Sequence, residues 1–497
     1  MNLASIIEAH PDDGVAIISR GLTTTYGELR DQVARLRGGL VGLGIDPGDR
    51  VGIICANNWY FAAGYLAVLG VGAVAVPLNP LSPAREIERE LAAVGARALF
   101  VGPAGRSTTD SIDRNRLAVL EFVVHSGGQA DDGSIDLESL LDAEPAPLVE
   151  RGDEDVAVLI FTSGTAGSPK AAMLSHGNLL TNIDQVIALR QHGADPEDVG
   201  FGVLPLFHIF GLNVVLGASL RAGATVVLVE RFDPSSAADV IREHRVTVLA
   251  GAPQMWTAWA AMPGLAADTF STVKVATSGA ARLDPAVATT IRDRFGVEIG
   301  EGYGLTEASP VVTSSFGLPW RPGSVGAPVD GVEIRLVDTD GEDVLVGDPG
   351  EIWVKGANVF QGYWNDLEAT RAAVDQDGWL HTGDIALVDD DGFLFLVDRA
   401  KDLIIVSGFN VFPAEVEEIL LELDGVAECA VVGVPHPHTG EAVKAFVVVE
   451  PGSSLEEDAV IEFAAGHLAR YKCPQKVNFV EELPLNLSGK VLRRALR

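Results

Sequence analysis

The chain has 497 residues, of which 47% are hydrophobic and 21% charged; this is the balance of a globular protein, long enough for two or three domains. Its 36 Lys and Arg residues against 69 Asp and Glu residues give a formal net charge of −33, which argues against general binding to nucleic acid or to anionic membranes. Basic residues that bind phosphate must therefore act locally, inside a site.

The cysteines predict a reducing compartment, and the N-terminal residues predict the absence of a signal peptide. Cys55, Cys429 and Cys473 are far apart, so we expect no disulfide framework, no metal site and no nucleophile among them. The first residues lack a basic region, so we expect no signal peptide and a cytoplasmic protein. The apolar run 59–76 is interrupted by glycines, and we expect it to divide into a buried helix (59–69) and a strand (73–76), not to span a membrane.

From the N-terminus to about residue 398, short apolar runs alternate with helical patterns. This alternation predicts an α/β fold of mainly parallel sheets flanked by helices. Ser82 and Ser175 are predicted helix N-caps, because each opens an amphipathic stretch. Residues 331–398 instead predict hairpins of a small antiparallel β subdomain, with the turn at DTDGED. The residues after Arg399 predict a compact α+β domain with a helix that has Pro413 in its first turn.

The segment Phe161–His176 (FTSGTAGSPKAAMLSH) follows an apolar run of strand length and is rich in glycine and hydroxyl residues. Such a loop exposes backbone N–H groups and hydroxyl donors with little side-chain bulk, as oligophosphate binding requires. Ser168 and Pro169 separate Gly167 from Lys170, which disfavours the Walker loop of P-loop NTPases. Taken alone, the segment also fits a flexible Gly/Ser turn between two strands.

Four further segments strengthen the phosphate interpretation: EGYGLTE (301–307), GWLHTGD (378–384), DRAKDLIIVSGFNVFPAEVE (398–417) and LPLNLSGKVLRR (483–494). In this order, with Phe161–His176, they resemble the core motifs of the adenylate-forming superfamily, which includes acyl-CoA synthetases, adenylation domains of peptide synthetases and beetle luciferases. The resemblance covers nearly the whole chain and is greatest to fatty-acid and aryl-acid CoA ligases. It implies a large N-terminal domain for ATP and acid (1–400), then a small mobile lid domain (401–497) with a hinge at Lys401.

The resemblance also implies roles for individual residues in the binding of ATP. The β- and γ-phosphates of ATP are expected at Thr162, Ser163, Gly164, Thr165, Gly167 and Lys170. Ala166 and Ala171 replace the usual Thr and Gly, so we expect modestly weaker ATP binding. The second side of the site is expected to consist of Gly279, Ala280, Glu301, Gly302, Tyr303, Gly304, Thr306 and Glu307. In that set Tyr303 lies near adenine, Thr306 reaches the α-phosphate and Glu307 holds Mg²⁺.

By the same resemblance, the C-terminal third supplies the remaining functional groups. Asp384 and Arg399 contact the ribose, and Gly408 lies along the pantetheine arm of CoA in the second half-reaction. Lys490 is the catalytic lysine that bridges the substrate carboxylate and the α-phosphate. Without the resemblance, Asp384, which follows a glycine, would be interpreted as a turn residue, and Lys490 as a solvated surface charge.

The segment 204–212 (LPLFHIFGL) sets the substrate class. Amino-acid-activating relatives have a Phe-Asp pair here that anchors the substrate ammonium, whereas this chain has Phe207 and His208. A histidine cannot anchor an ammonium as a carboxylate does, but it suits a carboxylate neighbour and an apolar tail; a core histidine is the alternative. The residues expected to line the acyl pocket are Phe210, Asn213, Met255, Trp256, Gly302 and Ala308.

The sequence therefore predicts an ATP- and Mg²⁺-dependent acid–CoA ligase, with a fatty acid favoured and an aryl acid of the cinnamate or benzoate type as the close alternative. An adenylating ligase that loads a carrier protein, or a nucleotide-binding protein without catalysis, stays open. The expected partners are the acid, ATP and CoA, without nucleic acid or an integral membrane span. The oligomeric state is open, and a homodimer is one option.

Lys490→Ala tests the adenylation assignment. We expect it to slow acyl-adenylate formation by roughly 10²–10³, on the order of 3–4 kcal/mol, as for loss of one preorganised charge donor. Thioester formation from supplied acyl-AMP should survive, because Lys490 leaves the site when the lid rotates. Single-turnover assays of the two half-reactions measure this, and equal loss of both would contradict the assignment.

Overall fold

The computed structural model describes residues 1–126, 133–162, 170–189, 195–399, 402–406, 409–437, 439–485 and 491–496. They belong to two compact units. The first comprises Met1–Glu333 and Val354–Leu380, and the second Ile334–Trp353 and His381–Arg497. The predicted domain boundary stays a prediction, because Lys401 lies outside the described residues.

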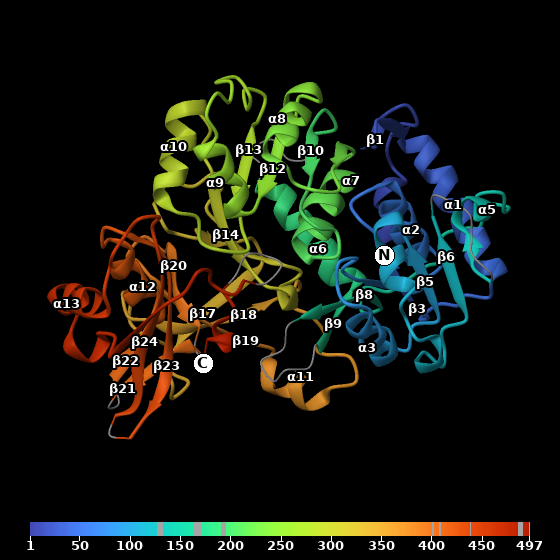
Figure 1. The fold of residues 1–497 in the computed structure, drawn as a ribbon. Coiled ribbons are helices and arrows are strands. Elements are labelled where there is room, and N and C mark those ends of the chain that lie inside the picture. Colours follow the sequence, from blue (N-terminus) through green and yellow to red (C-terminus); the bar gives the residue numbers. More distant parts are fainter. Residues whose placement is uncertain are drawn as a thin grey trace. The chain divides into compact units, whose positions relative to one another are not determined.

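The first unit contains two large sheets of mainly parallel strands with helices packed against them (Figure 1). Within the described residues, one sheet has nine strands in the order β16 (Ala327–Pro328), β15 (Val311–Ser314), β14 (Gly300–Gly304), β13 (Val275–Ser278), β12 (Val248–Gly251), β10 (Val199–Gly202), β11 (Thr225–Leu228), β1 (Val15–Ser19) and β2 (Leu22–Thr25). The other has seven in the order β7 (Ile135–Asp136), β6 (Phe122–His125), β5 (Ala98–Val101), β3 (Arg50–Ile54), β4 (Val74–Pro77), β8 (Val156–Thr162) and β9 (Lys170–Ser175). Antiparallel pairing occurs at the edges of the two sheets, in the pairs β1–β2, β14–β15, β15–β16 and β8–β9. The predicted α/β class is confirmed.

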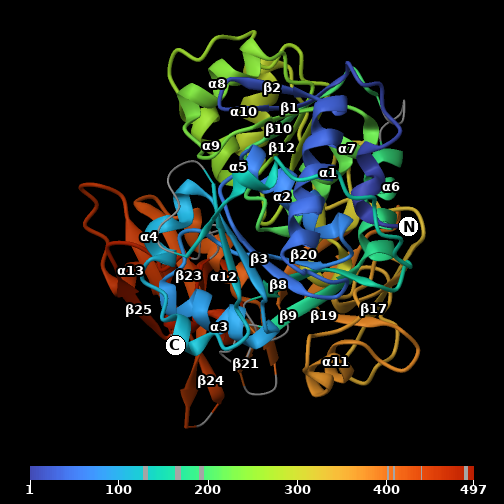
Figure 2. The ribbon, with the colours of Figure 1, turned by 90° about the vertical axis from the view of Figure 1, so that its right-hand side faces the viewer.

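The helices of the first unit connect these strands. They are α1 (Tyr26–Gly42), α2 (Trp59–Gly70), α3 (Ala84–Val94), α4 (Arg106–Thr109), α5 (Leu137–Leu140), α6 (His176–Ala188), α7 (Ala218–Ala222), α8 (Pro234–Glu243), α9 (Pro253–Ala261), α10 (Pro285–Phe295) and α11 (Leu367–Ala373). Short 3₁₀ segments are η1 (Leu3–Ile7), η2 (Pro103–Gly105), η3 (Arg114–Arg116) and η5 (Thr306–Ala308), and a π-helix, η4 (Phe210–Gly217), leads directly into α7. Helices α1 and α2 pack against each other (Figure 2).

The helix starts show one correct cap prediction and one wrong one. Ser175 caps α6, where its side chain accepts a hydrogen bond from the backbone N–H of Asn178 and the Asn178 side chain returns one, forming a capping box. Ser82 is not a cap, because α3 begins at Ala84 after Pro83. Pro83 itself takes the cap position with an extended backbone (φ −58°, ψ 145°), and its carbonyl accepts the first hydrogen bonds of the helix, from the N–H groups of Glu86 and Ile87.

The apolar run after Asn58 folds as predicted into a helix and a strand. Helix α2 ends at Gly70 and strand β4 begins at Val74, and both are buried in the first unit. In the part of the chain that the structure describes, no helix is both long and apolar enough to cross a bilayer. The thiol of Cys55 lies beside this region, and burial raises its pKa to about 12, so it stays protonated.

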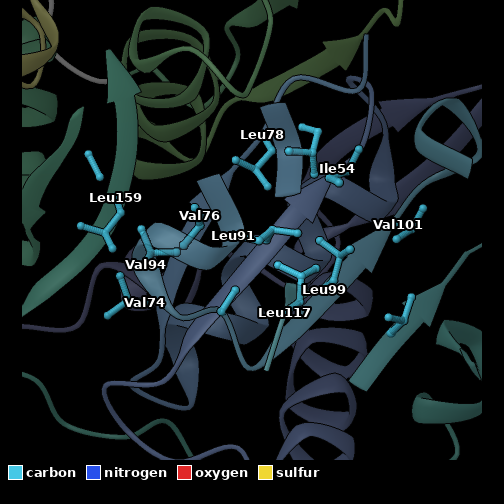
Figure 3. Packing of buried hydrophobic residues seen from close by; sticks show 14 residues of the cluster. Ile54, Val74, Val76, Leu78, Leu91, Val94, Leu99, Val101, Leu117 and Leu159 are labelled. Carbon is cyan, nitrogen blue, oxygen red and sulfur yellow. The ribbon is translucent and has the colours of Figure 1, made fainter. Parts of the chain in front are cut away.

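Helix α3 closes one hydrophobic core of the first unit over strands β3, β4, β5 and β8 (Figure 3). The fully or nearly buried side chains of this core include Ile54, Val74, Val76, Leu78, Leu91, Val94, Leu99, Val101 and Leu159. The strands read as continuous apolar runs because they are covered on both faces, as is usual for parallel sheets. This core fixes β8 and β9, which carry the two ends of the predicted phosphate loop.

The second unit contains the predicted small sheet and the α+β C-terminal part. The small sheet has the order β17 (Val332–Val337), β18 (Gly350–Gly356), β19 (Leu380–Val388) and β20 (Leu394–Arg399). The predicted turn follows β17, where Asp338 N–H donates to the carbonyl of Glu342 and Gly341 has φ 88°. The C-terminal elements are β21 (Ile404–Val406), β22 (Phe409–Val411), β23 (Val426–His436), β24 (Gly440–Val449), β25 (Lys476–Phe479), α12 (Pro413–Leu421), α13 (Glu457–His467), η7 (Arg470–Lys472) and η8 (Arg493–Ala495).

A buried histidine ties the N-terminal segment to helix α6. The Nδ1 atom of His176 accepts a hydrogen bond of 3.0 Å from the backbone N–H of Leu3, and the side chain has no exposed surface. Burial lowers its pKa to about 4, assisted by Arg151 and the N-terminal ammonium and opposed by Asp155 and Asp153. The imidazole is therefore neutral in the folded chain at neutral pH.

His176 should make the fold less stable in acid. Between pH 6.5 and 4 the unfolded imidazole binds a proton that the folded one does not, so stability falls as pH falls, by at most about 3 kcal/mol. His176→Asn keeps an acceptor near Nδ1 but does not titrate, so its urea midpoint should fall less between pH 7 and pH 4.5 than that of wild type. The same substitution at the half-buried His244 is the control, and parallel profiles for wild type and His176→Asn would contradict the prediction.

Candidate ATP and acid site

The sequence-predicted residues are divided between the two units, and part of them lies outside the described residues. Those outside are Ser163, Gly164, Thr165, Gly167, Gly408 and Lys490, together with the predicted hinge Lys401. The described structure reaches both ends of the phosphate loop, since Thr162 is the last residue of β8 and Lys170 the first of β9. These two residues are directly paired across the antiparallel strands. The two residues that flank the predicted loop therefore lie at one point of the sheet.

Lys170 and Glu307 are brought together by a residue that the sequence did not single out, Tyr363. The hydroxyl of Tyr363 donates a hydrogen bond of 2.7 Å to Oε1 of Glu307. The Nζ atom of Lys170 lies 5.1 Å from the centre of the Tyr363 ring. Desolvation, followed by the Glu307 charge, raises the pKa of Tyr363, so the hydroxyl keeps its proton and acts as a donor. The only sequence signal was the Gly362-Tyr363 dipeptide, which on its own reads as a turn.

Strand β14 places the EGYGLTE residues along one edge of the parallel strands. Its glycines permit close backbone approach, because a Cβ at Gly302 would lie 2.8 Å from the carbonyl oxygen of Thr313 and one at Gly304 only 2.2 Å from that of Pro310. The predicted adenine neighbour, Tyr303, is buried, and its backbone N–H donates to Oγ1 of Thr313. The half-buried Thr306 then opens the short helix η5, which ends the strand and carries Glu307.

Glu301, at the other end of this segment, joins β14 to the residues after β13. Its Oε2 accepts a hydrogen bond of 3.2 Å from the backbone N–H of Leu283, and its own N–H donates to Oγ of Ser315. Burial raises its pKa, while the Leu283 N–H and the charge of Arg282 oppose the change. Glu301 is thus partly a structural residue that fixes the loop carrying Gly279 and Ala280.

Gly279 and Ala280 lie where the loop after β13 meets the π-helix η4. A Cβ at Gly279 would lie 2.9 Å from Cε1 of Phe210, so the absence of a side chain lets this ring approach. Ala280 has φ 70°, a left-handed backbone that costs energy for any residue with a Cβ. Gly279 therefore lies against Phe210, one of the residues predicted to line the acyl pocket.

His208 precedes η4 and is not a core residue. Solvent reaches its side chain, whose ring centre lies 5.9 Å from that of Phe207. Surrounding protein atoms nevertheless reduce its hydration and lower its pKa below the ordinary 6.5. Because solvent still screens the ring, the associated free energy is small. The imidazole is neutral at pH 7 and can donate or accept one hydrogen bond at each nitrogen.

A small cavity lies behind this segment, on one face of the nine-stranded sheet. It has a volume of about 50 Å³, and its lining comprises Val186, Leu189, Gly200, Val214, Val215, Ser219, Val248, Ala250, Val275, Thr277, Ser314 and Phe316. None of the six predicted pocket residues is in that lining. Asn213 instead binds two backbone carbonyls, because its side-chain Nδ2 donates hydrogen bonds to Leu179 and Ser309. The sequence could not place the cavity, because its residues come from α6, η4, α7 and four strands.

Two predicted ribose contacts meet in the second unit. Asp384 of β19 is directly paired with the backbone of Arg399, the last residue of β20. Its backbone N–H also donates to Oγ1 of Thr382 at 3.1 Å. The two residues belong to different motifs and lie 15 positions apart in sequence. The antiparallel register of β19 and β20 brings their backbones together.

The donor set near Glu307 fits Mg²⁺ bound chiefly through nucleotide phosphates. The described residues contain no cluster of three or more His, Cys, Asp or Glu side chains that would hold a metal by itself. Mg²⁺ is usually bound by one or two carboxylates, with waters and substrate phosphates completing its shell. Glu307 can supply one such carboxylate, because Tyr363 engages only Oε1.

Comparison with known proteins agrees with these motifs. Residues 4–364 match the model of the AMP-binding enzyme family, and residues 415–490 match that of the AMP-binding enzyme C-terminal domain. The chain belongs to the AMP-binding enzyme family. The predicted membership of the adenylate-forming superfamily is therefore confirmed.

Relatives align along nearly the whole chain. A feruloyl-CoA synthase from Amycolatopsis sp is 38% identical over 97% of this chain and 95% of its own length. A long-chain-fatty-acid–CoA ligase from Bacillus subtilis (strain 168) is 34% identical over 97% and 91%. The crystal structure of ATP-bound MatB from Rhodopseudomonas palustris matches with a TM-score of 0.91 and 34% identity, over 100% of this chain and 98% of that one.

Proposed function

We propose that the protein converts an aryl carboxylic acid, of the cinnamate or benzoate type, into its CoA thioester through an acyl-adenylate. The chain is an acid–CoA ligase of the adenylate-forming family, and the proposal concerns which acid it takes. The sequence favoured a fatty acid and kept the aryl acid as the alternative. The cavity behind the π-helix now favours the aryl acid.

The position of this cavity suits the tail of the substrate. Phe210, beside Gly279, stands at the start of η4; Val214 and Val215 lie about one turn further along, and the same helical run continues to Ser219. On the sheet side, Thr277 of the cavity lining is paired with Gly300, the first residue of β14. The helix and the strand thus both lead from the predicted phosphate side to the cavity.

The size and chemistry of the cavity support a compact tail. Its volume of about 50 Å³ is well below the ~150 Å³ that holds benzene in a protein core, so a ring requires some side-chain adjustment and a long alkyl chain requires much more. The lining is mostly aliphatic but includes hydroxyl groups. Oγ of Ser219, a residue only 4% exposed, makes no hydrogen bond with the described part of the chain. A free hydroxyl there suits a polar substituent on a ring better than a methylene chain.

A fatty acid is the second candidate. The predominance of Val, Leu, Ala and Phe in the lining supports it, as does the 34% identity to the Bacillus subtilis enzyme. Longer acids would need the half-buried Val186, Val214 or Val275 to move. The two candidates therefore differ in how much the sheet face and helix α6 must separate.

The proposed chemistry assigns the described residues to definite tasks. In the first step an oxygen of the substrate carboxylate attacks the α-phosphorus of ATP, the bond to pyrophosphate breaks, and acyl-AMP forms. Lys170 and Thr306 bind phosphate oxygens, and Glu307 would hold Mg²⁺, which offsets phosphate charge when bound. The neutral imidazole of His208 donates to the substrate carboxylate end. In the second step the CoA sulfur, after losing its proton, attacks the acyl carbonyl and AMP leaves.

A panel of acids tests the proposal. Pyrophosphate release should be measured with and without CoA for benzoate, cinnamate, hydroxycinnamates, fatty acids of graded length and free amino acids. We expect the highest kcat/KM for a cinnamate-type acid, thioester formation with free CoA, and no comparable rate with any amino acid. A maximum at a long fatty acid would support the second candidate, and a demand for a carrier protein would contradict the CoA ligase.

Gly200→Ala tests whether the cavity holds the tail. A Cβ at Gly200 would lie 2.6 Å from Oγ of Ser219 but 3.8 Å from its Cβ, so the added methyl displaces the hydroxyl and fills the cavity. We expect kcat/KM for a cinnamate-type acid to fall on the order of 10-fold, with KM for ATP unchanged. The double variant with Ser219→Ala removes the clash and should recover part of the loss. No loss of kcat/KM for the cinnamate-type acid, or a loss that comes from a raised KM for ATP, would contradict the location.

A further inference from the structure

The segment from Phe360 to Trp364 links the two elements that carry the predicted phosphate and metal residues. Its backbone bonds to η5 through Phe360 N–H and the carbonyl of Glu307, at 2.8 Å. The segment also forms three backbone hydrogen bonds of 2.8–3.0 Å with β9. The N–H of Gln361 donates to the carbonyl of Met173, the N–H of Met173 to that of Gly362, and the N–H of Trp364 to that of Ala171. Residues 170, 307 and 363, far apart in sequence, are thus held at one place in the first unit.

The Tyr363 side chain is fixed from several directions. Its ring packs edge-on against that of Phe360 with centres 5.0 Å apart, and its backbone N–H donates to Oγ1 of Thr370 at 2.9 Å. From this position the hydroxyl donates to Glu307 and the ring lies beside the Lys170 ammonium. A single side chain therefore contacts both Lys170 and Glu307, two charged residues of the predicted Mg·ATP site.

Lys170 and Glu307 each contact Tyr363 and do not form a direct ion pair with each other in the described part of the chain. A direct pair would engage the ammonium and the carboxylate with each other and leave neither ready for phosphate or metal. Contact with an aromatic ring attracts the ammonium without using its N–H donors in strong hydrogen bonds. The hydroxyl engages one carboxylate oxygen and leaves the second for a ligand.

We propose that Tyr363 is a positioning residue for Mg·ATP, which orients the Glu307 carboxylate toward the metal and holds the Lys170 ammonium for the phosphates. This inference rests on the roles proposed above for Lys170 and Glu307. Tyr363 itself does not touch the reacting atoms. It limits the rotamers of a flexible glutamate and a flexible lysine before ATP binds, which lowers the conformational entropy lost on binding.

Two substitutions separate the hydroxyl from the ring. Tyr363→Phe should raise KM for Mg·ATP, and the Mg²⁺ concentration for half-maximal rate, by about 10-fold, as for loss of a hydrogen bond to a charged group. KM for the acid should not change. Tyr363→Leu also removes the ring beside Lys170, so it should weaken nucleotide binding even without Mg²⁺.

Binding is measured apart from turnover by calorimetry with α,β-methylene-ATP, which cannot be cleaved at the reacting bond, with and without Mg²⁺. Tyr363→Phe should weaken binding only when Mg²⁺ is present. Tyr60→Phe is the matched control, since the Tyr60 hydroxyl donates to Oε1 of Glu138 at 2.9 Å in another part of the first unit. The thermal midpoint of each variant reports whether the fold is intact.

Glu307→Gln distinguishes failure of this inference from failure of the site assignment. If Glu307→Gln keeps the wild-type Mg²⁺ dependence, Glu307 is not the metal ligand. The assignment of Glu307 and the positioning role of Tyr363 are then both overturned. If Glu307→Gln loses that dependence while Tyr363→Phe behaves like Tyr60→Phe, only the positioning role is overturned. The double variant Tyr363→Phe/Glu307→Gln should show the same Mg²⁺ dependence as Glu307→Gln alone, because the Tyr363 hydroxyl acts through the Glu307 carboxylate.

Discussion

The backbone pairing of the Phe360–Trp364 segment with strand β9 is the contact on which the candidate site depends. It joins a segment near the end of the first unit to the strand that begins at Lys170, and the bond from Phe360 to Glu307 adds the short helix η5. Backbone hydrogen bonds are directional and fix register, so three stretches of chain meet with little freedom. Side chains attached to such a frame can be placed precisely enough for phosphate chemistry.

The electrostatics of the protein make that precision necessary. A chain with net charge −33 repels ATP at long range, so attraction must come from a few donors at short range. In the proposed site, Lys170 at the start of β9, paired with Thr162 at the end of β8, would supply such a donor. Salt screening shortens the range of the unfavourable field to about 10 Å, which leaves the contacts inside the site dominant.

The sequence predicted the architecture well wherever periodicity and turn chemistry were strong. The structure agrees with the predicted division of residues 59–76 into a helix and a strand, with the N-cap at Ser175 and with the hairpin turn near Gly341. The predicted cap at Ser82 was wrong because the helix starts one residue later, with Pro83 at the cap position. These features depend on neighbours in sequence, which sequence patterns report directly.

The site was less predictable because it depends on contacts distant in sequence. Motifs identified Lys170 and Glu307, but their link through Tyr363 exists only after β9 pairs with residues near 363. The cavity was not predicted for the same reason, since Gly200, Val214 and Thr277 meet only when the sheet forms. Within the described residues, the backbone pairing of Asp384 with Arg399 is a further contact set by strand register.

We propose that the acid's tail lies between helix α6 and the strands while its activated carboxylate lies beside the Lys170–Tyr363–Glu307 cluster. A crystal structure with cinnamoyl-sulfamoyl-adenosine, a stable mimic of the acyl-adenylate, tests it most directly. The account predicts the ring in the cavity beside Val214 and Thr277, and the sulfamoyl group near Thr306. A ring bound elsewhere, with the cavity still empty or closed, would contradict it.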